Sequence, residues 1–260
     1  MQKFFIFVAV INLKTMISMR KLRLFAVAAM AAISVSAMAQ VTYGNDYSYQ
    51  PTNSKIYGSD NEAFSLFYIQ YSPSQLHSKA TNHGESATDN ESVNVLSLGY
   101  SYYIPLGDMP LFLTPGAAVQ WFFKSTEEKE VYGNNTYTYK TKFNMISAKI
   151  PINVMYSFEV SEAFRIEPYA GIYGRINIWG QSKDDDHSYN IFDKDEVGEA
   201  QQAKRFQLGW NAGVNFRITD AFTVGAGYYM DFMKFQDYEY KEHKFSTNFQ
   251  GFDITLGLNF

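Results

Sequence analysis

Apolar and polar residues alternate along eight segments of the chain, and the clearest alternation is at its C-terminal end. In the stretch GFDITLGLNF, Phe252, Ile254, Leu256, Leu258 and Phe260 share one parity, while Gly, Asp, Thr and Asn occupy the other. A period of two predicts a β-strand with two different faces. The eight segments are 63–71, 93–104, 111–123, 143–158, 164–179, 205–217, 221–232 and 248–260.

The connections between these segments alternate strictly between short and long. The short ones are 105–110, 159–163 and 218–220, and the long polar ones are 72–92, 124–142, 180–204 and 233–247. An up-and-down sheet places successive connections at opposite ends. The pattern therefore predicts an all-β fold, an up-and-down antiparallel β-barrel of eight strands with tight turns at one end and long loops at the other.

The alternation alone does not say which face points inward, because a soluble ligand-carrying barrel has its apolar side inside. Glycine recurs on the polar parity of the last three segments, as at Gly209, Gly225 and Gly257. A solvent-facing sheet gains nothing from glycine, whereas a crowded interior needs small residues. We therefore expect the polar face inside and the apolar face against lipid; the face of segment 63–71 is left unassigned.

Charged residues of both signs fall on the inward parity and predict an interior ion-pair network that fills the lumen. Three prolines, Pro115, Pro151 and Pro168, lie inside strands, where a missing N–H donor predicts local bulges. The predicted network consists of Lys149, Arg165, Glu167, Arg175, Arg217, Asp231 and Asp253.

The N-terminal region reads as a secretory signal peptide, residues 1–39. Basic residues precede an apolar stretch, and Ala37 and Ala39 form an A-x-A cleavage site ahead of Gln40. An earlier apolar run indicates that the true start is Met16 or Met19; the alternative is a doubly anchored N-terminus. We expect residues 40–61 to form a polar lead-in and residues 62–260 to form the barrel.

Composition narrows the class of protein further. The chain has no Cys, 20 Tyr and 22 Phe, and its mean hydropathy is −0.25, which excludes a polytopic helical membrane protein and a disulfide scaffold. Removal of residues 1–39, which hold five basic and no acidic residues, would leave 17 basic against 26 acidic residues, a net charge of −9. Such an acidic exported chain is not expected to bind nucleic acid.

The terminal pattern Phe252, Ile254, Leu256, Leu258 and Phe260 resembles the C-terminal strand signal of bacterial outer-membrane barrels. From about residue 62 the chain resembles the small outer-membrane β-barrel families of Gram-negative bacteria, in particular the porin-family, opacity-type barrels, in a style like that of Bacteroidota. The resemblance implies localisation in the outer membrane and recognition by the barrel-assembly machinery. It also implies contact with periplasmic chaperones, outer-membrane lipid and lipopolysaccharide.

Candidate chemistry lies only in the predicted loops. Acidic clusters 184–186 and 193–196 and the four histidines (His77, His83, His187 and His243) match no catalytic or metal-binding spacing, so we assign no catalytic, cofactor or metal residue. The expectation is a non-enzymatic outer-membrane protein with a filled lumen, acting in envelope integrity, surface interaction or limited small-solute binding. The alternatives are a loop-based outer-membrane enzyme and a soluble periplasmic barrel that binds an apolar ligand.

Overall fold

The computed structural model describes residues 63–83, 85–107, 109–132, 135–184, 187–198, 202–240 and 243–260, and the side chains of 128–137 are not part of that description. The expected signal peptide with Ala37, Ala39 and Gln40, and the lead-in 40–61, lie outside the described residues. Within the described part of the chain, no helix is long and apolar enough to cross a membrane; this observation says nothing about crossing with strands.

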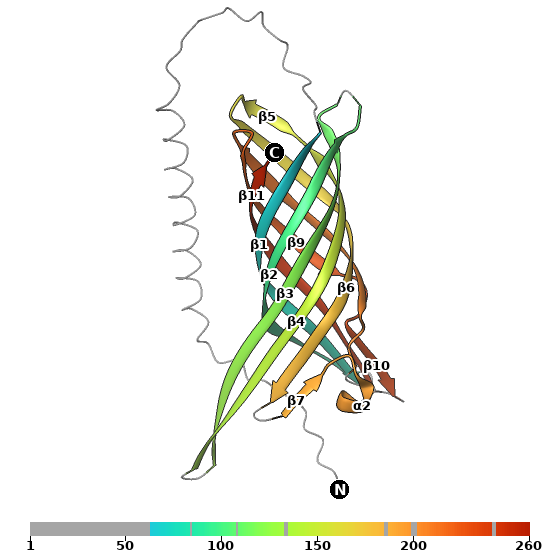
Figure 1. The fold of residues 1–260 in the computed structure, drawn as a ribbon. Coiled ribbons are helices and arrows are strands. Elements are labelled where there is room, and N and C mark those ends of the chain that lie inside the picture. The colour runs from blue at the N-terminus through green and yellow to red at the C-terminus, as the bar shows by residue number, and fades with distance from the viewer. Residues whose placement is uncertain are drawn as a thin grey trace, which may run out of the picture. The chain divides into compact units, whose positions relative to one another are not determined.

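Eight long strands form a closed antiparallel ring (Figure 1). Neighbours in sequence are neighbours in the sheet, and the ring closes where β1 pairs with β11. Three short strands extend it at the margins: β5 and β7 pair with β6, and β10 pairs with β11. The elements are β1 (Phe64–Asn82), β2 (Glu85–Pro105), β3 (Leu111–Tyr132), β4 (Asn135–Tyr156), β5 (Phe158–Ser161), β6 (Phe164–Asp184), β7 (His187–Asn190), α2 (Lys194–Val197), β8 (Phe206–Ile218), β9 (Phe222–Asp231), β10 (Gln236–Tyr240) and β11 (His243–Asn259).

The chain end takes part in closing the ring. The N–H of Ser65 donates to the carbonyl of Phe260 at 2.9 Å, and the N–H of Phe260 donates back at 3.0 Å. A closed ring leaves no sheet edge in its body, so the backbone groups are paired inside the barrel wall. The predicted eight-stranded, up-and-down antiparallel barrel is confirmed.

The predicted long loops are wrong in part, because most of their residues continue the strands. Residues 72–82 and 85–92 belong to β1 and β2, and residues 124–132 and 135–142 belong to β3 and β4. Figure 1 shows that the β3–β4 hairpin extends well past the other strands, at the end of the barrel opposite the C-terminus. These stretches are polar on both faces, so they lack the one-sided alternation by which a strand is recognised, yet Thr, Tyr and Val still favour extended backbone.

The face assignment is confirmed by the exposure of the side chains. On β8, Gln207 and Asn211 are buried, while the alternating Phe206, Leu208 and Trp210 are exposed to the outside of the barrel. β1, left unassigned from sequence, turns Gln70, Ser72 and Ser74 inward and Phe67 and Ile69 outward.

The bulges predicted at Pro115, Pro151 and Pro168 are not found. The β2–β3 and β3–β4 ladders skip the pairs beside Pro115 and Pro151, but their register is the same on both sides, and Pro168 pairs with Val214 without a break. Proline removes one donor yet remains compatible with extended backbone, so the strand keeps its residue count. The register of the β4–β6 ladder shifts elsewhere: Ile146 pairs with Trp179 and Ser147 with Asn177, which leaves Ile178 as the extra residue.

Candidate functional site: the filled lumen

Six of the seven predicted network residues lie inside the barrel. Lys149, Glu167, Arg175, Arg217, Asp231 and Asp253 are each at most 6% exposed. Arg165 is different: it lies near the short-turn end, where its guanidinium is 3.6 Å from the carboxylate of Glu159 on β5, and its side chain remains 26% exposed. The six buried charges do not form one continuous network but are distributed over three layers.

The first layer is centred on an ion pair between Arg175 of β6 and Asp231 of β9. Both side chains are completely buried, and the hydroxyl of Tyr173 donates to the same carboxylate. The guanidinium carbon of Arg175 also lies 5.1 Å from the ring centroid of Phe122 and 5.2 Å from that of Phe249. Nε and Nη1 of Arg175 have no hydrogen-bond partner among the described residues, so the aromatic faces supply the rest of the cation's environment.

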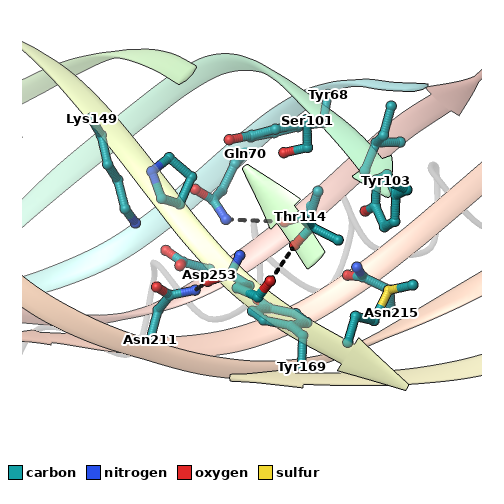
Figure 2. A pocket seen from close by; sticks show the side chains of 15 residues that line it. Tyr68, Gln70, Ser101, Tyr103, Thr114, Lys149, Tyr169, Asn211, Asn215 and Asp253 are labelled. Atoms are coloured by element: carbon teal, nitrogen blue, oxygen red, sulfur yellow. Dashed lines mark hydrogen bonds between the residues drawn. The ribbon is translucent and has the colours of Figure 1, made fainter. Parts of the chain in front are cut away.

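The second layer surrounds a small cavity of about 60 Å³ (Figure 2). Lys149 and Asp253 both line this cavity; Nζ of Lys149 lies 4.3 Å from the ring centroid of Tyr173, and Asp253 accepts a hydrogen bond from Ser72 at 2.5 Å. Gln70 donates to Thr255 at 3.1 Å nearby. The cavity is polar and has room for a few water molecules, at roughly 10–15 Å³ each, which suits two charges without a direct ion pair.

The third layer lies at the short-turn end and is built on Glu167 and Arg217. Arg217 donates from Nε to the Glu167 carboxylate at 2.7 Å and again from Nη2, while the hydroxyl of Ser157 donates to the same oxygen at 3.1 Å. The guanidinium lies 4.1 Å from the ring centroid of Phe64, which stacks on Tyr103. An apolar cluster that includes Leu66, Phe112 and Met155 packs around this layer.

An apolar plug closes the long-hairpin end of the lumen. Ile191 and Phe192, from the connection that carries α2, fold inward and pack with Phe235 and Phe249. The fold of this connection is fixed by backbone hydrogen bonds from Ala203 to Ile191 at 2.9 Å and from Lys204 to Phe235 at 2.7 Å. The full set of buried residues in this cluster is Val93, Val95, Phe122, Met145, Tyr173, Ile191, Phe192, Ala203, Tyr229, Phe235 and Phe249.

The plug was not predicted from the sequence, because Ile191 and Phe192 are two isolated apolar residues in a polar, acidic stretch. Phe122 is also fully buried in the lumen and belongs to this cluster. A signal was present: three consecutive aromatic residues, Trp121 to Phe123, cannot all lie on one face of a strand. Trp121 and Trp179 do lie outside, at 46% and 44% exposure.

Within the described residues, the histidines and acidic side chains of the hairpin end form no common cluster. Nδ1 of His77 contacts Oδ1 of Asn90 at 2.7 Å in an exposed pair, and the rings of His83 and His243 are 5.8 Å apart. Asp193 caps the short helix α2 by accepting from the N–H of Asp195. Among the described residues, which exclude Asp185 and Asp186, no three His, Asp or Glu side chains come close enough to hold a metal ion.

Solved structures similar to this chain are outer-membrane proteins. The attachment invasion locus protein Ail of Yersinia pestis, in complex with the heparin analogue sucrose octasulfate, is 16% identical over 76% of this chain and 99% of its own, with a TM-score of 0.34. Neisserial surface protein A is 17% identical over 75% and 97%, with a TM-score of 0.39. OprG of Pseudomonas aeruginosa is 9% identical over 78% and 98%, with a TM-score of 0.41.

No curated protein matches the sequence. A family model described as "Outer membrane protein beta-barrel domain" matches residues 63–237, which is more than half of the chain and includes seven of the eight ring strands. The protein therefore belongs to the outer membrane protein beta-barrel domain family and is localised in the outer membrane of a Gram-negative bacterium.

Proposed function

We propose that this protein is a non-enzymatic, non-conducting surface protein: a sealed barrel that anchors and presents β-hairpins outside the outer membrane. The observation that carries this proposal is the Arg175 layer. A fully buried ion pair between β6 and β9, held between the rings of Phe122 and Phe249, lies inside the lumen, with the plug beyond it. A barrel of eight strands has an interior that side chains just fill, so side chains take the space that a channel would need.

The hairpins supply the surface for interaction. Pairing between β2 and β3 ends at Asn94 and Phe123, and pairing between β4 and β6 ends at Thr141 and Asp184. Beyond these points β3 and β4 pair only with each other among the described strands, as a two-stranded ribbon. The ribbon has a polar sequence and no further described strand along its edges, which suits a role in contacting molecules outside the cell more than a role in transport.

Planar-bilayer conductance tests the sealed lumen. Protein purified from outer membranes in detergent is expected to give no stable stepwise openings. A variant that removes the layer, Tyr173→Ala with Arg175→Ala, is expected to give small openings, provided that it still migrates as a folded barrel in an unheated gel. Stable openings of the unaltered protein would contradict the proposal.

Protease treatment of intact cells tests the orientation. The ribbon is expected to be cleaved between residues 125 and 140 while the ring strands remain protected. Cleavage only after the outer membrane has been permeabilised would mean that the hairpins face the periplasm, and it would contradict the proposed surface role.

A further inference from the structure

Four hydrophilic residues form one cross-strand row on the outside of the barrel. Ser125 of β3 pairs with Lys142 of β4, Lys142 pairs with Lys183 of β6, and Lys183 pairs with Ser188 of β7. Directly paired residues in antiparallel strands point to the same face, with Cβ atoms about 5 Å apart. All four side chains are exposed, so the row places two lysine side chains in neighbouring positions, flanked by two serines.

This row lies just beyond the aromatic residues of the lipid-facing surface. A second cross-strand row, alongside the first, consists of Trp121, Ile146 and Trp179. Each of these side chains is exposed on the outside. Lys142 is four residues from Ile146, and Lys183 is four residues from Trp179, which is about 13 Å along a strand. Tryptophan marks the boundary between hydrocarbon and headgroups, so the lysine pair falls at the depth of the lipid headgroups on the long-hairpin side.

Among the described residues, the two lysines of the row have no carboxylate within ion-pair distance. Four other lysines of the described chain each have a carboxylate within ion-pair distance: Lys124 with Glu91, Lys140 with Glu127, Lys204 with Asp237 and Lys244 with Glu239. Within the described part of the chain, neither Lys142 nor Lys183 has an ion pair. Like charges directly opposite each other destabilise a sheet, so the pairing of Lys142 with Lys183 does not stabilise the fold.

An open hollow on the outer surface adjoins Lys142 of this row. It is lined by Trp121, Phe123, Lys124, Ser125, Lys142 and Asn144. Its floor is organised: the rings of Trp121 and Phe123 lie 4.8 Å apart, and the indole N–H donates to Oδ1 of Asn144 at 3.4 Å. The hollow therefore offers an apolar base below and cationic and hydroxyl groups above, which matches an amphiphile with an anionic headgroup.

We propose that the row Ser125–Lys142–Lys183–Ser188 binds the phosphate of an anionic lipid in the outer leaflet, with the hollow over Trp121 and Phe123 taking the part of the lipid next to the phosphate. A phosphate neutralises the two lysine ammonium groups and accepts hydrogen bonds from the hydroxyl groups. The inference rests on the placement in the outer membrane and does not depend on the sealed lumen.

The test is binding of lipid A to the protein in neutral detergent, measured by native mass spectrometry and by the change in tryptophan fluorescence. Lys142→Gln with Lys183→Gln is expected to weaken binding of bisphosphorylated lipid A roughly 25-fold at low ionic strength, since each lysine near an anionic surface contributes about fivefold. The matched control, Lys79→Gln with Lys244→Gln, also removes two exposed lysines and is expected to bind as the unaltered protein does.

Two further binding measurements identify the ligand. Lipid A freed of its phosphates is expected to bind the unaltered protein as weakly as the double variant binds the phosphorylated form, and millimolar inorganic phosphate is expected to compete poorly. Equal binding by the unaltered protein and the double variant would overturn the proposal. So would full displacement by inorganic phosphate, which would indicate a site for a free anion. Channel recordings have no bearing on this result, so its failure is distinguishable from that of the proposed function.

Discussion

Arg175 on β6 and Asp231 on β9 are 56 residues apart in the chain, and their side chains form a completely buried ion pair inside the lumen. β8 lies between β6 and β9 in the ring, so the pair bridges two strands that are not neighbours. The lumen is therefore held by contacts across its interior as well as by the hydrogen bonds of its wall.

Replacing one partner of this ion pair should lower the free energy of unfolding. Asp231→Asn or Arg175→Met leaves an uncompensated buried group, and each is expected to lower the free energy of unfolding by about 3–5 kcal/mol. The double variant is expected to recover a large part of that loss, because neither charge is then left alone. Urea titration in detergent micelles measures the free energy of unfolding of all three variants.

The exposed pair Lys204–Asp237 provides the control: Lys204→Gln should change the free energy of unfolding by about 0–1 kcal/mol. Additive losses in the double variant would show that the two groups act independently.

Interior glycines should tolerate no side chain where a neighbouring strand is close. A Cβ on Gly213 would lie 2.5 Å from the carbonyl oxygen of Ala226 and 2.7 Å from Cα of Gly227. Gly213→Ala is expected to destabilise the barrel by about 1–3 kcal/mol through overpacking. The control is Gly174→Ala on the outer face, where the nearest atoms are side-chain carbons of Phe206 and Leu208 at 3.8 and 3.9 Å, so the change should be neutral or slightly stabilising. The same unfolding titration ranks the two variants, and an equal effect would contradict the assignment of faces.

The plug should open without unfolding the barrel. Phe192 is 6% exposed and lies against Arg205, whose guanidinium carbon is 4.5 Å from the ring centroid. Phe192→Ala is expected to speed amide hydrogen exchange strongly in residues 187–198 and 202–205 and to leave the ring strands protected, because truncating a buried Phe costs about 3–5 kcal/mol and these residues are stabilised locally. Phe206→Ala, the control, removes a ring that is 46% exposed outside the barrel and should leave exchange in the plug unchanged. If Phe192→Ala leaves exchange unaltered, Phe192 does not hold the plug in place.

Phe260 should matter for assembly rather than for stability. Its ring is 73% exposed, whereas its backbone closes the sheet through two hydrogen bonds with Ser65. Phe260→Ala keeps those bonds, so unfolding in detergent should shift by less than about 0.5 kcal/mol. If the terminal pattern is read by the assembly machinery, the amount of folded protein in outer membranes of expressing cells should nevertheless fall severalfold. Normal assembly in cells would remove the role assigned to this residue.

The ring of strands could be predicted because one physical rule governs each of them. Residues that alternate between lipid and a packed lumen must alternate in polarity, and this placed Lys149, Arg175 and Asp253 on the inner face without knowledge of their partners. The partners themselves depend on the shear of the ring, which is a property of all strands together. The sequence therefore predicted one interior network, whereas the structure has three layers and leaves Arg165 with Glu159 near the short turns.

The hairpins and the plug could not be predicted for a different reason. Beyond the membrane a strand has water on both faces, so the alternation disappears although the backbone continues in β3 and β4. Ile191 and Phe192 are buried by tertiary contacts at the mouth, and two apolar residues carry no periodicity. The bulge at Ile178 likewise has no proline or glycine of its own to signal it.

The central claim is that the apolar face of the barrel wall contacts lipid while the polar face is packed inside. Because the chain has no Cys, single cysteines can be spin-labelled cleanly at outward positions such as Val119, Ile150 and Ile172, which are 57%, 55% and 60% exposed. Electron paramagnetic resonance on protein in lipid vesicles then measures collisions with oxygen, which concentrates in hydrocarbon, and with a water-soluble nickel complex. We expect high oxygen and low nickel accessibility at all three positions. High nickel accessibility there would mean that water wets the apolar face and would contradict the account.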